Sequence, residues 1–534
     1  MKGCFYACRK TSGFNSAFCS HSHPSLCISR SRHGEHHYPI CHWSFRRWRG
    51  FNFVVLAKGK KLPLSHRRQP ETEKRPRAEM MLSRVSGSFR DPSGHVYEGT
   101  EHIYRTVESS AAADYEAARN AGIFESPMIV STTESTAPSP SKTASYLLEH
   151  PRIPLISYPY EWSFSMLKDA ALLHLDFHLH LLGRGFTLSD ATAYNVQFLG
   201  PTPVFIDHLS VRRYRDGEYW EGHRQFCEQF LVPLLLRSFF GISHNAWYRG
   251  ALEGISIADF VKMLRFRQKV SWRVLAHLVL QDKFQRSASA GQAEKAQHRQ
   301  LPRNAYTATL QQLRNWIAGL SPRDTDPTTW ANYATANTYS NTEATLKKQF
   351  VGDFIRRSGA TTVIDLGCNT GDYSEVALHN GAQRVFGFDF DQQALDSAYH
   401  RAKNKSLNLL PLFLDARNQS PSQGWLQEER TGFASRAKAD AALALAFEHH
   451  LAIAHNIPLE QVVDWLISVA PTGVVEFVPK DDPTVRTMLA LRRDIFPDYN
   501  YDHFISLIGR RARVLENLVV SSTGRTLISY SRNG

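Results

Sequence analysis

The sequence predicts an α/β protein, because short apolar runs alternate with helical patterns throughout the C-terminal part of its 534 residues. Most of these runs are almost uninterrupted, which is typical of parallel strands that helices cover on both faces. The last two runs differ, because only residues 521–524 separate RVLENLVV (513–520) from RTLISYS (525–531). Such a short connection cannot cross over a sheet, so these two strands must pair antiparallel.

The other strands of this sheet are expected at VIDLG (363–367), RVFGFD (384–389), LLPLFLD (409–415), ADAALALA (439–446) and GVVEFV (473–478). Helical patterns lie between them, as at residues 458–469, and another helix is expected ahead of the first strand, over 343–358. We therefore predict a mostly parallel sheet with helices on both faces and an antiparallel last strand.

Residues 80–285 are predicted to form a separate α+β domain. HVYEGTEHIYRTV (95–107) is typical of a β-hairpin around a glycine. Two further strands are expected at VQFL (196–199) and VFID (204–207). Long helical patterns lie on either side of them, at residues 161–183 and 218–284.

Residues 284–304 are small and polar, which is the composition of a linker. We place a linker and a helix over 286–325, and the predicted C-terminal domain over 326–534. No transmembrane segment is expected, since no apolar run approaches the roughly 18 residues that a membrane span needs.

The N-terminal tail, residues 1–79, carries nearly all of the net charge. It holds 16 Lys and Arg against four acids, a charge of +12 out of +13 for the whole chain. Because the remainder is almost neutral, we do not expect nucleic acid as a partner. The tail is rich in Cys and His, but it contains no CxxC pair, so no metal site is expected.

This tail is predicted to be disordered, or to be an extension upstream of the true translation start; a targeting peptide is the other interpretation. Outside it, only Cys227 and Cys368 remain. Two lone thiols suit a reducing compartment, so we expect a soluble, cytoplasmic protein.

The turn DLGCNTG (365–371) joins the first strand of the C-terminal sheet to a helix. Backbone N–H groups at such a turn face a ligand at the carboxyl edge of the sheet. The glycine spacing differs from the GxGxxG of dinucleotide sites, which makes NAD a poor candidate. Asn369 stands where a further glycine is expected, and Asn is the non-glycine residue that most readily adopts positive φ.

Three strands in sequence end in an acid: Asp365, Asp389 and Asp415. A single such residue is usually a helix cap, but three in order indicate a shared ligand. An acid for an ammonium group, an acid for a ribose and a tight turn suit S-adenosylmethionine (SAM), which has an amino-acid end, an adenosine end and no phosphate.

Residues 326–534 resemble the class I SAM-dependent methyltransferases. The resemblance rests on the turn DLGCNTG, the acid of FGFD, the segment LALAFEHHL and the antiparallel last strand. It implies a Rossmann-like sheet and three groups of cofactor residues. Asp365, Gly367, Asn369 and Gly371 would line the methionine end, Asp389 the ribose and Asp415 the adenine; Asn369 departs from the usual glycine.

The acceptor end of this site is expected at Glu448, His449 and His450, directly after the fourth strand. A histidine there could act as general base for an oxygen or nitrogen acceptor. The alternative is that these side chains only pack or form hydrogen bonds at the start of a loop. Aromatic residues of the segment 329–340, including Trp330, Tyr333 and Tyr339, are expected to form either a lid over the cofactor or part of the core.

The front domain contains a second set of polar residues. Asp190 and Asn195 are five residues apart, and Asp207 ends the next strand. This spacing resembles the catalytic loop and metal-binding Asp of protein kinases, in which these residues would bind Mg-ATP.

The resemblance to kinases over 95–285 is incomplete. Ser189 replaces an Arg, His208 and Leu209 replace Phe and Gly, and Arg105 stands in place of the strand lysine; a GxGxxG loop is missing. A degenerate kinase-like module that binds or scaffolds is therefore favoured over an active kinase.

The leading interpretation is a SAM-dependent methyltransferase that acts on a small molecule or glycan. The whole chain also resembles rhizobial host-specific nodulation proteins, which implies a signal-molecule or cell-surface substrate. Two alternatives stay open: an ATP-dependent phosphotransferase in residues 95–285, and a non-catalytic scaffold that binds SAM.

Overall fold

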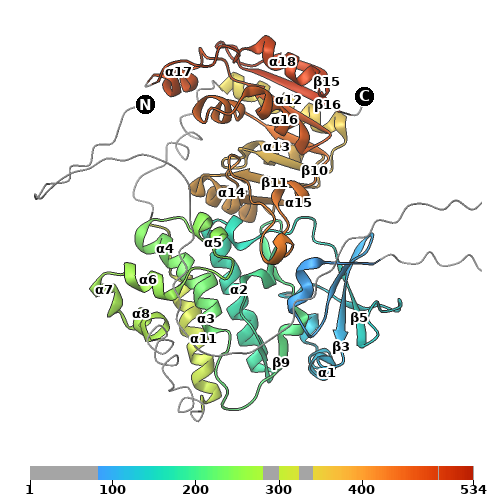
Figure 1. Cartoon of the computed structure of the whole chain (residues 1–534), viewed down its shortest axis with the longest axis vertical. Helices are drawn as coiled ribbons and strands as arrows, with labels where there is room; N and C mark the ends of the chain where they lie inside the picture. The colour runs from blue at the N-terminus through green and yellow to red at the C-terminus, as the bar shows by residue number, and fades with distance from the viewer. Residues whose placement is uncertain (1–81, 281–299, 324–340, 491, 533–534) are drawn as a thin grey trace, which may run out of the picture. The chain divides into compact units, whose positions relative to one another are not determined.

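The computed structural model describes residues 82–280, 300–323, 341–490 and 492–532 (Figure 1). The chain divides into two compact units, residues 1–77 and 78–534, and all the described residues belong to the second. The basic tail, most of the predicted linker and the three aromatic residues Trp330, Tyr333 and Tyr339 lie outside the described residues. Within the described ranges, no helix combines the length and the apolar character needed to cross a membrane.

The front domain begins with a five-stranded antiparallel sheet of order β1-β2-β3-β5-β4. The predicted hairpin is present, with Val96 opposite Arg105. Thr133 and Glu134 pair with β5. The elements are β1 (Ser83–Arg84), β2 (Val96–Glu98), β3 (His102–Glu108), α1 (Ala112–Asn120), β4 (Thr133–Glu134) and β5 (Ala144–Pro151).

The long helix α2 (Phe164–Gly183) follows this sheet, and the Ser163 hydroxyl caps it by accepting a hydrogen bond from the Met166 N–H. Two short antiparallel pairs come next: β6 (Phe186–Leu188) with β9 (Val211–Arg213), and between them in the chain the hairpin of β7 (Val196–Leu199) with β8 (Thr202–Phe205). Strand β8 begins and ends two residues before the segment expected from the sequence.

The pattern over 218–284 is not one long helix in its described part. Gly241 ends α4 with φ +70, a left-handed conformation that glycine adopts readily. The helices are α3 (His223–Phe226), α4 (Val232–Phe240), α5 (Asn245–Gly250), α6 (Ile257–Met263), α7 (Phe266–Lys269) and α8 (Trp272–Val274), with α11 (Arg303–Ala318) after the gap.

The C-terminal domain contains a seven-stranded sheet of order β12-β11-β10-β13-β14-β16-β15. The first five strands in this order are parallel, and β16 pairs antiparallel with both β14 and β15. This confirms the predicted Rossmann-like sheet and its antiparallel last strand. The strands are β10 (Thr362–Leu366), β11 (Arg384–Asp389), β12 (Leu409–Phe413), β13 (Ala441–Ala444), β14 (Thr472–Phe477), β15 (Arg513–Val519) and β16 (Thr526–Ser531).

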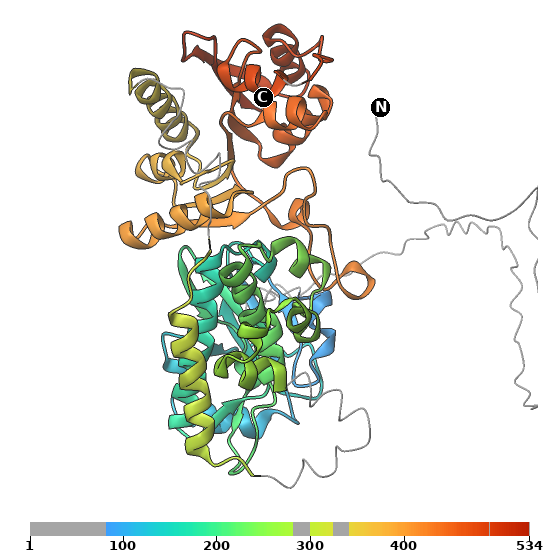
Figure 2. The same ribbon diagram turned by 90° about the vertical axis from the view of Figure 1, so that its left-hand side faces the viewer.

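Both faces of this sheet are covered, as the uninterrupted apolar strands predict. Val363 packs in a cluster with Phe350 and Ile355 of α12, while its neighbour Ile364 packs in the cluster that contains Leu466 of α16. Successive residues of a strand point to opposite faces, so each face needs its own helices (Figure 2). The helices of this domain are α12 (Asn341–Ser358), α13 (Asp372–His379), α14 (Gln392–Lys405), α15 (Phe433–Arg436), α16 (Leu459–Val469), α17 (Pro483–Leu489) and α18 (Tyr501–Gly509).

Candidate active site

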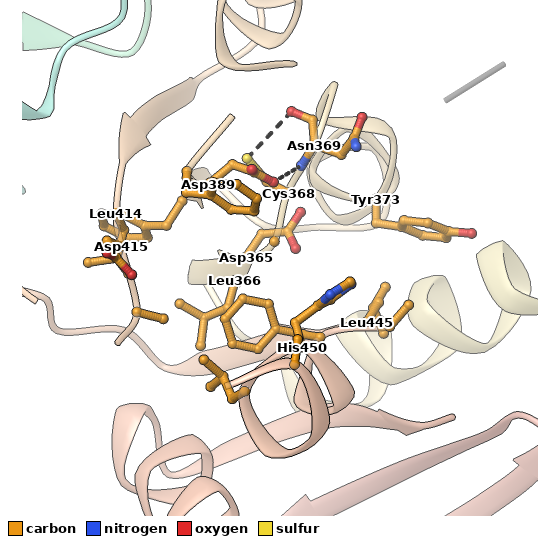
Figure 3. Close-up of a pocket in the computed structure, with 18 of the residues that line it drawn as sticks. Asp365, Leu366, Cys368, Asn369, Tyr373, Asp389, Leu414, Asp415, Leu445 and His450 are labelled. Atoms are coloured by element: carbon orange, nitrogen blue, oxygen red, sulfur yellow. Dashed lines mark hydrogen bonds between the residues drawn. The ribbon is translucent and has the colours of Figure 1, made fainter. Parts of the chain in front are cut away.

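A pocket of about 510 Å³ opens at the carboxyl edge of the C-terminal sheet (Figure 3). Its walls come from the turn after β10 and from the residues that follow β11, β12 and β13. The strands β10 and β11 are neighbours in the sheet, so the residues at their ends meet at one rim. The pocket therefore lies where the sequence analysis places the ligand.

Gly367, Cys368 and Asn369 of the turn form one wall of this pocket, whereas Gly371, at the end of the turn, is not among its lining residues. Gly367, Asn369 and Gly371 all have positive φ, at +74°, +48° and +81°. Asn369 thus adopts the left-handed conformation that the sequence predicts for it. The N–H groups of Gly367 and Cys368 both donate to the Phe388 carbonyl, at 2.8 and 3.1 Å, which ties the turn to the end of β11.

Gly367 also allows close packing against the opposite wall. A Cβ atom at this position would lie 2.8 Å from Cδ2 of Phe447. Phe447 follows β13 and lines the pocket, so the missing side chain lets the two walls approach. Glycine is required at Gly367 both for its φ and for this contact.

Asp365 is buried at the end of β10, where its carboxylate accepts a 2.6 Å hydrogen bond from the Ser374 hydroxyl on α13. Burial raises the pKa of Asp365 to about 6, and the neighbouring Asp389 adds to the shift, while the Ser374 bond opposes it. The Ser374 bond holds the side chain in one orientation, facing the pocket.

Asp389 ends β11 and accepts two backbone hydrogen bonds of 2.9 Å, from the N–H groups of Asn369 and Asp391. Burial raises its pKa to about 6, although these two bonds favour the ionised form. The Phe390 backbone also donates to Asp389. A carboxylate offers about four acceptor sites, so Asp389 keeps capacity for a donor in the pocket.

Asp415 follows β12 and forms a bidentate ion pair with Arg417, whose Nε and Nη2 atoms lie 2.8 and 2.9 Å from the two carboxylate oxygens. Burial alone would raise the pKa of Asp415, but the bonds from Arg417 outweigh it and hold the pKa below its usual range. Asp365, Asp389 and Asp415 all line the same pocket (Figure 3). The structure thus brings the three predicted acids together.

The three residues predicted at the acceptor end lie in different environments. His450 lines the pocket, whereas Glu448 and His449 are buried outside its walls. Glu448 accepts hydrogen bonds from the Val478 N–H and the Tyr499 hydroxyl, both at 2.8 Å. Glu448 therefore links the end of β14 to the segment before α18, which is the structural role that the sequence analysis gave as the alternative to catalysis. Of the three residues, His450 remains the candidate at the acceptor end.

Lys347 is a pocket residue that the sequence analysis missed. It lies on α12, almost completely buried, with its Nζ 2.6 Å from the Glu476 carboxylate and 4.7 Å from the centre of the Tyr373 ring. Two features of the sequence could have revealed the pair. Lys347 shares a helix face with the apolar Val351 and Phe354, and Glu476 interrupts the apolar run GVVEFV.

The polar residues of the front domain form a second, separate cluster. The Asn195 amide donates to Asp190 and Asp207, at 3.1 and 3.2 Å. Arg105 on β3 pairs with Asp207 at 2.7 Å and also with Asp91. Burial, with the charge of Asp207, raises the pKa of Asp190 to about 7.

The sequence spacing thus predicted that Asp190, Asn195 and Asp207 lie together. It did not predict that the positively charged Arg105 pairs with Asp207 in the same cluster. In the described part of the chain, no three His, Cys, Asp or Glu side chains are grouped as metal ligands would be. This geometry gives no support to Mg-ATP, and the kinase-like fold of the domain remains a prediction.

Comparison with known proteins agrees with the C-terminal site. The model of the FtsJ-like methyltransferase family matches residues 344–428, which contain β10, the glycine turn, Asp389 and Asp415. The nodulation protein NoeA of Rhizobium meliloti (strain 1021) is 51% identical over 459 residues, covering 84% of this chain and 96% of that protein. The chain belongs to the NoeA family. This member of the NoeA family therefore carries a methyltransferase domain in its C-terminal part.

Solved structures match the NoeA-family chain over shorter stretches. The N-methyltransferase NodS from Bradyrhizobium japonicum WM9 shares 12% identity, covering 36% of this chain and 97% of its own, with a TM-score of 0.27. WbdD shares 19% identity, covering 41% of this chain and 47% of its own, also with a TM-score of 0.27. Similarity at this level supports no conclusion about activity or substrate.

Proposed function

We propose that the C-terminal domain transfers the methyl group of SAM to a small-molecule or glycan acceptor. The observation that carries this proposal is the convergence of Asp365, Asp389 and Asp415 on one pocket, beside the positive-φ residues Gly367 and Asn369. A pocket of about 510 Å³ is within the range of small-molecule sites, about 300–1,000 Å³.

Each acid has a place along the cofactor. Asp389 accepts the ribose hydroxyls with the capacity that its backbone hydrogen bonds leave. Asp415 lies beyond it, at the adenine end, where Arg417 fixes its orientation. The turn from Gly367 to Gly371 and the buried Asp365 hold the methionine end, close to the ring of Tyr373 and to Lys347.

SAM supplies an electrophilic methyl group on a positively charged sulfur, so the protein mainly has to align the acceptor for in-line attack. His450 faces the pocket, and burial lowers its pKa to about 2, with the neighbouring His449 and His455 adding to the shift. It is therefore neutral at physiological pH. A neutral imidazole can accept a hydrogen bond from an acceptor hydroxyl or amine and orient its lone pair toward the methyl group.

The wall around His450 suits a compact acceptor with an apolar part. Phe447, Leu451, Ala454 and Met488 line the pocket beside it. The related NoeA is named as a nodulation protein. We accordingly place the acceptor among the small molecules or glycans of nodulation signalling or of the cell surface.

Calorimetry with SAM and S-adenosylhomocysteine tests the cofactor assignment. The unaltered chain should bind both at micromolar concentration, and Asp389→Ala should weaken binding at least about tenfold, since one charge-assisted hydrogen bond is worth roughly 1.5–3 kcal/mol. Asp481→Ala, which removes an exposed aspartate of the same domain, is the matched control and should bind normally. Equal affinities for the two variants would contradict the role of Asp389.

Formation of S-adenosylhomocysteine separates an enzyme from a SAM-binding scaffold. Incubation with SAM and fractionated extracts of candidate acceptors should release this product, and Asp389→Ala should reduce the release. Tight SAM binding without product from any acceptor fraction would favour the scaffold.

SAM affinity should fall as the pH is lowered through about 6. The pKa of Asp389 is raised from 3.8 to about 6 in the folded protein, so its carboxylate takes up a proton in that range and loses acceptor capacity for the ribose. Calorimetry between about pH 5 and pH 8 measures the effect. In the Asp389→Asn variant this side chain cannot titrate, so the SAM affinity of the variant should vary less with pH. If the SAM affinity of both proteins changed equally with pH, Asp389 would not be the cause of the pH dependence.

A further inference from the structure

Residues 262–273 of the front domain combine exposed apolar side chains with a local excess of positive charge. The segment KMLRFRQKVSWR contains five Lys and Arg residues, and no Asp or Glu occurs between residues 260 and 281. By contrast, the 455 residues after the basic tail have a net charge of only +1 (+13 less the +12 of the tail). This segment, which we call the basic–aromatic surface, is therefore much more positive than the chain after the tail as a whole.

The fold holds these side chains outward. The segment runs through the end of α6, the short helix α7 and the start of α8 (Figure 1). Leu264 and Val274 are buried and anchor it to the helical core. Between them, Phe266 is 79% exposed and Trp272 is 69% exposed. Because buried residues flank the exposed ones on both sides, the packing of the domain itself presents these rings to the surroundings.

Aliphatic and charged groups surround the two rings. Val270 and Met263 are also exposed, and so are the guanidinium groups of Arg265 and Arg267. Lys262, the first residue of the segment, forms a 2.8 Å ion pair with Asp259, which precedes the segment in the sequence. The ten residues from Met263 to Trp272 thus expose four apolar side chains together with Arg265 and Arg267, and exposed apolar groups rimmed by polar ones mark interaction sites.

We propose that the basic–aromatic surface docks this protein reversibly on anionic lipid bilayers. Trp and Phe side chains insert favourably at the boundary between headgroups and acyl chains, and Lys and Arg beside them attract anionic headgroups. The long stems of Arg and Lys can lie along apolar groups while their charges stay at headgroup level. The exposed apolar side chains would thus contact acyl chains, and the Lys and Arg charges would contact anionic headgroups.

A nucleic acid fits these observations less well. Its recognition uses cations along a groove that follows the phosphate backbone, with rings that stack on bases. The basic–aromatic surface adds the aliphatic Val270 and Met263 to the exposed centre, and these side chains gain nothing from stacking. They do gain from insertion among acyl chains.

Vesicle co-sedimentation of the full chain tests the proposal. Binding should be strong to vesicles of phosphatidylglycerol mixed with phosphatidylcholine, and at least about tenfold weaker to pure phosphatidylcholine. Raising NaCl from about 0.1 M to about 0.5 M should weaken it further, because salt screens exposed charges. Phe266→Ser with Trp272→Ser should abolish the binding, and Arg265→Gln with Arg267→Gln should weaken it at least about tenfold.

Matched controls carry the same changes elsewhere. Trp425→Ser with Leu426→Ser removes two other exposed apolar side chains, and Arg213→Gln with Arg215→Gln removes two exposed arginines of the same domain. Both controls should bind vesicles normally, and circular dichroism with thermal melts checks that every variant is folded. The proposal is overturned if folded test variants bind like the controls, if neutral and anionic vesicles bind equally, or if vesicles do not bind while a labelled RNA 20-mer does.

Discussion

Lys347→Met is expected to lower the free energy of unfolding by about 3–5 kcal/mol, the largest stability effect that the structure predicts. The substitution leaves the Glu476 carboxylate buried, fully inaccessible and without the ammonium group that lies 2.6 Å from it. A carboxylate ionised in that position loses a charge that offsets the cost of its burial. Urea denaturation followed by circular dichroism measures the change.

The double variant Lys347→Met with Glu476→Gln should recover a large part of this loss, because it removes both charges together. Lys348→Met is the matched control: it alters the next residue of α12, which is exposed, and should change stability by less than about 0.5 kcal/mol. A single variant as stable as this control would show that the pair contributes little.

Gly367→Ala is expected to weaken SAM binding at least about tenfold and to lower the melting temperature. A non-glycine residue at a left-handed φ costs roughly 1–2 kcal/mol. The added Cβ would also lie 2.8 Å from the Phe447 ring, so either the turn or that wall of the pocket must move. Calorimetry and thermal melts measure the two effects separately.

Gly359→Ala separates the clash from the backbone strain. Gly359 also has positive φ, at +63°, but no atom lies within 4 Å of an added Cβ. This control should lower the melting temperature by strain alone and leave SAM binding unchanged. If both variants lost SAM affinity equally, the contact with Phe447 would not explain the effect.

Much of the C-terminal domain could be predicted from residue patterns because its signals are local. Uninterrupted apolar runs indicated strands covered on both faces, and the four residues at 521–524 required an antiparallel pair. Parallel strands end at the same edge of a sheet, so residue order alone was enough to place the acids at their ends together. The φ of Asn369 was predictable for a similar reason, since it depends on the residue and its turn.

The front domain shows where such signals weaken. The spacing of Asp190, Asn195 and Asp207 correctly indicated a cluster, since Asp190 and Asn195 precede the hairpin of β7 and β8 and Asp207 follows it. The positive charge that offsets the acids of this cluster comes from Arg105, which lies on β3 about a hundred residues earlier in the sequence. Helical periodicity over 218–284 likewise overlooked the breaks between short helices, because periodicity records which face is buried and not where a helix ends.

The sequence by itself determined the order of the strands along the chain, the positive-φ turn and the acids at three strand ends. Only the tertiary structure decided that His450, and not the adjacent Glu448 or His449, lines the pocket, because successive residues at a helix start point in directions about 100° apart. It also decided that Lys347 meets Glu476 across 129 positions of chain. Pairing between distant residues depends on how helices pack against the sheet, and no local pattern contains that information.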